Sequence, residues 1–144
     1  MTDPIADFLT RVRNGYLAGK KQMVVPHSRI KEQLSQILVK EGYLGKLKIE
    51  NSTPRLRSGL TVSEVEPSKF KILKLTLKYE GKKPALTDIK RISKPSLRIY
   101  TKAKEIPRVK TGFGITIVST PSGLMSDREA RKKNLGGEVI CQIW

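Results

Sequence analysis

The 144-residue sequence predicts an α+β fold made of two small α/β modules that pack against each other. Two apolar stripes at helical spacing lie within the first 42 residues, and short β-rich runs fill the second half. A polar segment interrupted by Gly and Pro, Glu80–Pro84, separates the two regions. We expect an N-terminal α-β-α-β-β module over residues 1–82 and a C-terminal, mostly β module with one short helix over residues 83–144.

The first helix is predicted to begin at Asp3-Pro4, because aspartate caps helices and proline fits the first helical position. Asn14-Gly15 lies near its expected end. Ser28 is suited to cap a second helix that ends at Gly42. Apolar residues recur at helical spacing in both segments: Ile5, Phe8, Leu9, Val12 and Tyr16 in the first, and Ile30, Leu34, Ile37 and Leu38 in the second.

The remaining N-terminal elements are predicted to be strands. Val24–Pro26 is a short strand candidate, and Leu44–Glu50 and Phe70–Tyr79 are expected to form a hairpin. Between them, Asn51–Lys69 is rich in Ser, Thr, Pro and Gly, which predicts a long exposed loop.

Strands are also predicted for most of the C-terminal module. Ile89–Ser93 and Leu97–Lys102 flank a turn at residues 94–96, and Gly112–Thr120 and Glu138–Trp144 are two further β-rich runs.

A short helix is expected before the last strand. Ser126 and Glu129 have the spacing of a capping box, with Met125 and Ala130 placed as a hydrophobic staple. Gly136-Gly137 is expected to end this helix.

Charge is the strongest indication of function. The chain carries 29 Lys and Arg against 13 Asp and Glu, a formal net charge of +16, and each half contributes +8. Such an excess is typical of a protein that binds a polyanion. No apolar run approaches the ~20 residues of a membrane-spanning helix, and the N-terminus does not resemble a targeting peptide, so we expect nucleic acid rather than a membrane.

One predicted strand presents a basic, aromatic face. Alternation within Leu97–Lys102 places Leu97 and Ile99 on one side, and Arg98, Tyr100 and Lys102 on the other. Cations can neutralise phosphates and a tyrosine ring can stack on a base. An ordinary solvated face is the alternative, and the net charge favours RNA.

A second candidate is the segment Ser119–Gly123, which closes an apolar strand ahead of the short helix. Small hydroxyls and a glycine allow close approach to a ribose-phosphate chain, although a plain strand-to-helix turn has the same composition. Arg128, Arg131 and Lys132 then form a basic stripe at helical spacing, which is either a phosphate-facing surface or a solvated one.

No catalytic or metal site is expected. The glycine pairs at Gly112-Phe113-Gly114 and Gly136-Gly137 lack the spacing of a phosphate-binding loop. His27 has no cysteine partner or obvious carboxylate relay, and Cys141 falls within a strand, where cysteine behaves as a small apolar residue. The acidic residues are scattered, which argues against a nuclease, and we expect no enzyme, cofactor or small-molecule substrate.

Several of these segments resemble one family, the small-subunit ribosomal protein eight of bacteria and plastids. The resemblance runs nearly from end to end: Asp3–Asn14, then Arg91–Tyr100, then Val118-Ser119-Thr120 with Gly123–Ala130, and finally Gly136-Gly137-Glu138. It implies two docked α/β modules and binding to the central domain of small-subunit ribosomal RNA, mainly by the C-terminal module. Pro121 departs from the serine of many relatives.

The resemblance and the residue patterns together give one set of expected RNA contacts. In the C-terminal module these are Ser119, Thr120, Ser122, Gly123, Glu138, Tyr100, Lys102, Arg98, Arg128 and Arg131; the N-terminal module adds a second, weaker surface of Thr10, Arg13, Asn14 and Lys31. The acidic Glu138 is expected to accept from a base amino group or a ribose hydroxyl, or to brace the neighbouring loop.

Two functions from this class stay open: a structural part of the small ribosomal subunit, beside neighbouring small-subunit proteins, or a translational repressor that binds a messenger hairpin mimicking the ribosomal site. Affinities for the two RNAs would separate them. The length of Asn51–Lys69 and the last residues, Cys141–Trp144, favour a plastid or cyanobacterial ribosome over that of other bacteria.

Overall fold

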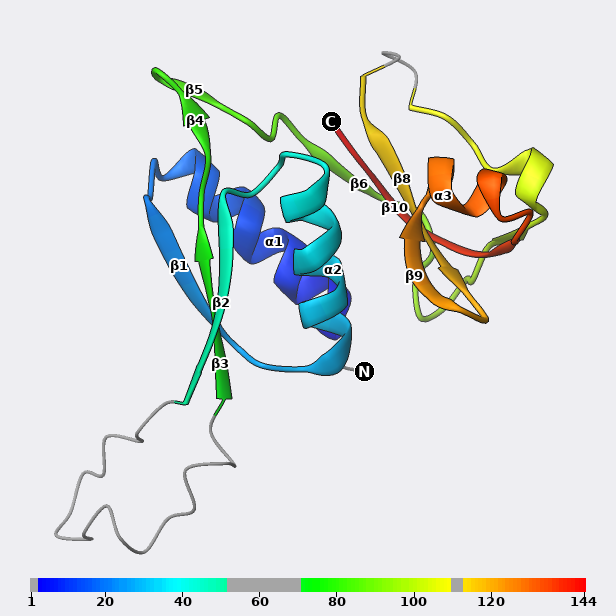
Figure 1. Cartoon of the computed structure of the whole chain (residues 1–144), viewed down its shortest axis with the longest axis horizontal. Helices are drawn as coiled ribbons and strands as arrows, with labels where there is room; N and C mark the ends of the chain where they lie inside the picture. Colours follow the sequence, from blue (N-terminus) through cyan, green and yellow to red (C-terminus); the bar gives the residue numbers. More distant parts are fainter. Residues whose placement is uncertain (1–2, 52–70, 110–112) are drawn as a thin grey trace, which may run out of the picture.

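The computed structural model describes residues 3–51, 71–109 and 113–144. The two larger sheets lie at opposite ends of the molecule, with two helices between them (Figure 1). The elements are α1 (Pro4–Leu17), β1 (Gln22–Pro26), α2 (Arg29–Lys40), β2 (Lys46–Asn51), β3 (Lys71–Thr76), β4 (Tyr79–Glu80), β5 (Lys83–Pro84), β6 (Ile89–Arg91), β7 (Tyr100–Thr101), the 3-10 helix η3 (Ala103–Glu105), β8 (Ile115–Thr120), β9 (Gly123–Ser126), α3 (Asp127–Lys132) and β10 (Gly137–Ile143). The fold is mixed α+β, as predicted.

Both N-terminal helices begin at their predicted caps. The Asp3 carboxylate accepts a hydrogen bond from the Ala6 amide at 3.1 Å, and the Ser28 hydroxyl accepts one from the Lys31 amide at 3.3 Å. Each bond satisfies one of the amides that a first helical turn leaves without an intrahelical partner.

Asn14-Gly15 lies near the end of α1, as expected, within its last turn. The helix continues to Leu17, and Gly19 takes the left-handed conformation beyond it, with φ of 68°. Gly15 is buried inside the helix, where a Cβ atom would lie 3.2 Å from the Leu77 side chain. It therefore serves close packing of the helix on the sheet, and it does not terminate the helix.

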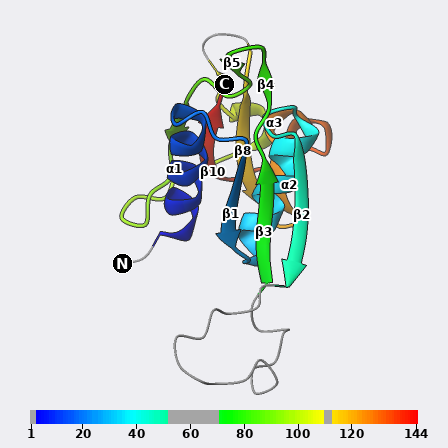
Figure 2. The same ribbon diagram turned by 90° about the vertical axis from the view of Figure 1, so that its left-hand side faces the viewer.

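The N-terminal sheet has the order β1-β3-β2 and is antiparallel throughout. The predicted hairpin of the second and third strands is confirmed. The loop expected at Asn51–Lys69 lies, apart from Asn51, outside the described residues. Both helices cover one face of this sheet, and the other face is the surface turned to the viewer in Figure 2.

The C-terminal sheet has the order β6-β10-β8-β9, with β7 paired to β10. Its last strand in chain order, β10, was predicted and lies in the centre. Strand β9 was missed: the segment after Thr120 is a hairpin turn, and it is not a strand-to-helix turn. The predicted strand Leu97–Lys102 shortens to Tyr100–Thr101, and Leu97 is 66% exposed, so the expected apolar face does not pack on the core.

The short helix α3 begins as predicted and ends differently. The Ser126 hydroxyl accepts from the Glu129 amide, and Met125 and Ala130 lie in one buried cluster. The helix ends before Asn134, which adopts φ of 54°, so the expected end at Gly136-Gly137 is wrong. Asparagine tolerates this conformation better than most residues.

One apolar core extends from the N-terminal helices into the C-terminal sheet. Phe8, Leu34 and Leu38 belong to the same buried cluster as Ile117 and Ile143. The Lys40 ammonium also bonds the Glu129 carboxylate across the two regions, and this hydrogen bond raises the pKa of Lys40. The boundary between residues 82 and 83 falls within the β4–β5 hairpin and stays a prediction. No described helix is both long and apolar enough to cross a membrane.

Candidate nucleic-acid interface

Three of the predicted contact residues form a row across the C-terminal sheet. In the β7-β10-β8 register, Glu138 pairs with Tyr100 on one side and with Ser119 on the other. Side chains at directly paired positions lie on the same face of a sheet. Tyr100, Glu138 and Ser119 therefore lie side by side on one face of the sheet, although Tyr100 and Glu138 are about 40 residues apart in the sequence. We call these three residues the Glu138 row.

The carboxylate at the centre of the row is largely removed from water. The Glu138 side chain is 14% exposed, and the Arg98 guanidinium lies 3.4 Å and 3.5 Å from its two oxygens. These are long contacts for a charge-assisted pair, and Arg98 itself is more than half exposed. The carboxylate oxygens thus keep capacity to accept hydrogen bonds from a ligand.

The turn between β8 and β9 is held by one hydroxyl. Thr120 donates to the Gly123 carbonyl at 2.8 Å and accepts from the Ser122 amide at 3.2 Å. Gly123 has φ of 107°, a conformation that side chains rarely allow. Because Thr120 is 8% exposed while Ser122 is exposed, the serine is available to a ligand and the threonine fixes the shape of the turn.

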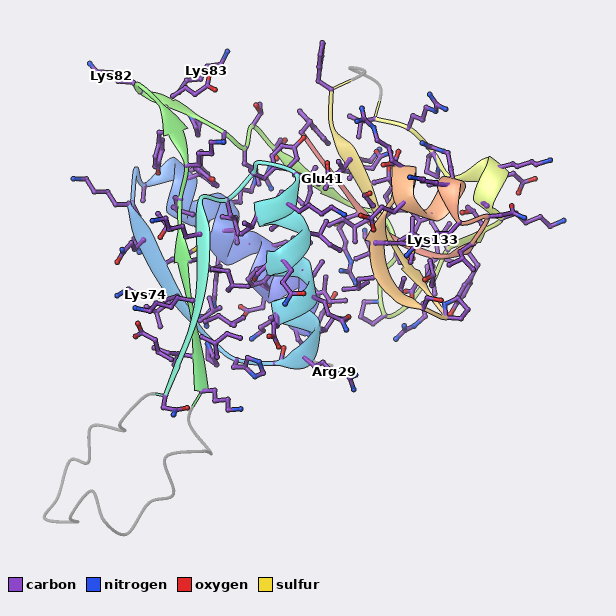
Figure 3. All side chains as sticks on the ribbon, viewed as in Figure 1. Arg29, Glu41, Lys74, Lys82, Lys83 and Lys133 are labelled. Atoms are coloured by element: carbon purple, nitrogen blue, oxygen red, sulfur yellow. The ribbon has the colours of Figure 1, made fainter. Side chains whose placement is uncertain are left out.

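A cleft of about 400 Å³ opens beside the Glu138 row, where the starts of α1 and α2 approach the C-terminal sheet. Arg91, Lys94 and Arg98 line it together with Glu138 and Asp3. Basic side chains are also distributed over the rest of the molecule, from Lys82 at the β4–β5 hairpin to Lys133 after α3 (Figure 3).

The basic stripe on α3 is only partly available. Arg131 bonds the Asp127 carboxylate at 3.0 Å and the Ile106 carbonyl at 3.1 Å, and its side chain is 23% exposed. It therefore braces α3 against the segment after η3, and its expected contact with RNA stays a prediction. Arg128 and Lys132 are exposed, as predicted.

Of the four residues predicted on the N-terminal module, Thr10, Arg13 and Asn14 lie at helical spacing on α1, and Lys31 lies on α2. Thr10 and Arg13 line a hollow of about 160 Å³ beside β6, and Arg13 pairs with Asp88 at 2.5 Å. Asn14 instead lines a groove beside β1. Lys31 is half-buried in the first turn of α2.

Three polar contacts, two made by Arg91 and one by His27, were missed in the sequence. Arg91 bonds the Ser93 carbonyl and lies 3.5 Å from the Asp3 carboxylate, so it links the start of α1 to the C-terminal sheet. No local pattern signals a contact between residues so distant in the chain. His27 lies 3.0 Å from the Glu32 carboxylate, a partner that we did not expect. Among the described residues, no group of three or more His, Cys, Asp or Glu could hold a metal ion.

Comparison with known proteins tests the resemblance directly. The family model of ribosomal protein S8 matches residues 3–144 of the chain. The chain belongs to the ribosomal protein S8 family. It is 47% identical to the small ribosomal subunit protein uS8 of Caldanaerobacter subterraneus subsp. tengcongensis, 48% to that of Syntrophomonas wolfei subsp. wolfei and 44% to that of Clostridium novyi; each alignment covers 100% of this chain and 98% of the relative.

The family is one of structural proteins of the small ribosomal subunit, and these relatives are bacterial. They do not support the expected plastid or cyanobacterial origin. The alignments with the Caldanaerobacter and Syntrophomonas proteins run over 145 positions and include this whole 144-residue chain. Bacterial members therefore have almost the same length, and the length of residues 51–69 does not point to a plastid.

Proposed function

We propose that this protein is a structural component of the small ribosomal subunit that binds the central domain of its ribosomal RNA. The observation that carries the proposal is the Glu138 row, a mostly buried carboxylate aligned between a tyrosine and a serine on one sheet face. Membership of the ribosomal protein S8 family supports RNA as the partner, and the net charge of +16 suits a partner that is a polyanion.

The row favours recognition of RNA by more than charge. A carboxylate repels phosphate, so Glu138 is suited to accept from a base amino group or a ribose 2′-hydroxyl. Tyr100 is 67% exposed, which leaves its ring free to stack on a base. Arg98 and Lys102 flank the row and supply cations for the backbone. Residues that recognise bases and residues that neutralise phosphates would therefore lie next to each other on this face.

The β8–β9 turn is a second place where RNA can come close to the protein. Ser122 is exposed at the turn, and at Gly123 no heavy atom lies within 4 Å of where a Cβ would stand. An RNA backbone can therefore come close to the main chain at this point. We assign Thr120 a positioning role, because its hydroxyl holds the turn from inside.

Filter binding to a central-domain ribosomal RNA fragment, with competitor transfer RNA, tests the proposal. Glu138→Gln keeps the shape of the side chain and removes the charge that strengthens its hydrogen bonds. We expect a loss of about 10-fold in affinity for the specific fragment, equivalent to ~1.4 kcal/mol. Glu105→Gln, at an exposed position in η3, is the control. Equal affinity of both variants and the parent for the specific RNA would contradict the role of the row.

The salt dependence of RNA affinity separates residues that position the turn from residues that neutralise phosphates. Thr120→Ala should weaken the specific complex and leave the slope of log affinity against log salt unchanged, whereas Thr120→Ser should restore affinity. Lys102→Ala should lower that slope by about one unit if Lys102 meets a phosphate. Equal slopes for the alanine variants of Thr120 and Lys102 would refute this division.

The same titrations test whether the protein is a ribosomal component or a translational repressor. A messenger hairpin that mimics the ribosomal site tests the repressor function, and ribosomal RNA should bind more tightly if the structural role is the main one. In cells, the protein should sediment with small ribosomal subunits, beside neighbouring small-subunit proteins.

A further inference from the structure

Strand β1 forms a free edge of the N-terminal sheet, since β3 is its only partner strand among the described residues. The Lys21 carbonyl accepts from the Leu77 amide at 2.9 Å, and the His27 amide donates to the Lys71 carbonyl at 3.0 Å. Bonded pairs alternate along an antiparallel ladder. Odd-numbered residues of β1 therefore bond β3, and the amide and carbonyl of Val24 point toward the free edge.

This edge lacks the charged side chains that sheets often place on their outer strands, and Pro26 blocks pairing only at its last residue. Charged side chains on an edge oppose pairing with another chain. The opposite edge, β2, carries Lys46 and Lys48, whereas β1 reads Gln22-Met23-Val24-Val25-Pro26 and has no charge. Val24 is 52% exposed. The edge is thus open, uncharged and partly apolar.

A groove of about 610 Å³ runs along this edge, between β1 and the second half of α1. In Figure 2, α1 lies on the side of β1 away from β3. Gly15, Ala18 and Met23 give the groove an apolar lining, and Arg11 and Lys20 supply cations. An edge strand beside a helix is the arrangement by which several peptide-binding domains accept an extended segment.

We propose that β1 accepts an extended, acidic segment of a partner protein as a fourth strand of the N-terminal sheet. Backbone pairing fits the outward groups of Gln22 and Val24, and small apolar side chains fit beside Gly15 and Ala18. Arg11 pairs with Asp7 at 3.1 Å, so among the described residues that line this groove the cation without an ion pair is Lys20, and it selects acidic residues.

Two other occupants of this groove, a second copy of this chain and RNA, are disfavoured by their charge or their chemistry. A second copy of this chain would bring two bodies of +16 together, and like charges oppose that association. RNA lacks a peptide backbone that could continue the ladder. The groove also lies on the N-terminal module and shares Asn14 alone with the expected RNA contacts, so RNA held at the Glu138 row leaves it accessible.

The probe is a fluorescein-labelled peptide with alternating Glu and Val, and a Lys-Val peptide of equal length is its control. Fluorescence anisotropy with the full chain should show binding of the acidic peptide and at least 10-fold weaker binding of the basic one. Comparable binding of both peptides would overturn the proposal.

Val24→Pro tests the backbone pairing. It removes an amide that points to the free edge and leaves the β1–β3 bonds in place, and Pro26 already occupies an outward position two residues on. We expect it to weaken peptide binding at least 10-fold, with Val24→Ala within about twofold of the parent. A circular dichroism spectrum matching the parent shows that the fold persists. Equal affinity of the proline and alanine variants would overturn the added strand.

Lys20→Glu tests the charge, with Lys82→Glu on the distant β4–β5 hairpin as its matched control. Both reverse one positive charge at an exposed site, and only the first should weaken binding. Equal losses in both would mean that the net charge alone attracts the peptide. Displacement of the peptide by ribosomal RNA, or dimers of the unliganded chain in sedimentation, would also overturn the proposal.

Discussion

Gly137→Ala is expected to be one of the most destabilising single-methyl changes in the protein. A Cβ atom at Gly137 would lie 2.0 Å from the Ser119 carbonyl oxygen, whereas ordinary contacts begin at 3.4 Å. Strands β8 and β10 would have to move apart by more than 1 Å. The position has no positive φ, so steric exclusion alone requires glycine.

The cost follows from what that movement breaks. Overpacking between the two strands costs ~1–3 kcal/mol, and each weakened ladder bond beside Glu138 adds about 1 kcal/mol. The smaller entropy of the unfolded alanine chain offsets about 0.4–1 kcal/mol. We expect a net loss of about 3 kcal/mol in the free energy of unfolding, measured by urea titration with circular dichroism.

Gly45→Ala is the matched control for this prediction. Its nearest heavy atom is also a backbone carbonyl oxygen, that of Thr76, but at 3.3 Å, and the site is exposed. We expect a change below about 1 kcal/mol, typical of a surface substitution. If the Gly45 and Gly137 variants lose equal stability, close strand contact is not the reason for glycine at 137.

Three further predictions concern buried groups and caps. Burial raises the pKa of Cys141 from 9.0 to about 12, so the unfolded chain ionises first and stability falls as pH rises from 9 toward 12. At pH 10 the loss is about 1.4 kcal/mol, and comparison with Cys141→Ala in urea titrations at pH 8 and 10 isolates it; a constant difference would contradict it. Ser126→Ala should cost ~1 kcal/mol by removing the cap of α3, and unchanged thermal stability would refute that role. Arg131→Ala should lower thermal stability and leave the salt dependence of RNA binding unchanged, because Arg131 bonds Asp127 and the Ile106 carbonyl; a slope lower by one unit would show instead that it meets a phosphate.

Local chemistry explains which parts of the fold the sequence could predict. The starts of α1, α2 and α3 depend on a side chain three residues before the amide that it caps, so Asp3, Ser28 and Ser126 were readable in the sequence. Strand β9 was missed because its four residues follow directly on a turn. The short pairing of β7 depends on β10, which lies almost forty residues later.

Contacts at long range explain the roles of glycines that the sequence did not predict. Gly136-Gly137 was expected to end α3, and Asn14-Gly15 was expected near the end of α1, because glycine often marks helix ends. Their actual neighbours come from distant parts of the chain: the Leu77 side chain, after β3, for Gly15, and the carbonyl oxygens of Thr101 and Ser119 for the pair. Glycine is present at these positions because a side chain would not fit, and the sequence does not show which distant part of the chain occupies that space.

A β-bulge in β10 decides which face carries Glu138. Glu138 pairs with Ser119 and Cys141 with Ile117, so the register shifts by one residue between them. Strict alternation would put residues 138 and 141 on opposite faces. The extra residue in β10 places both on the face that packs against the N-terminal helices, and a bulge is a recognised means of re-aiming a side chain. The same face thus supplies Cys141 to the core and Glu138 to the edge of the cleft, so the candidate site depends on the core for its geometry.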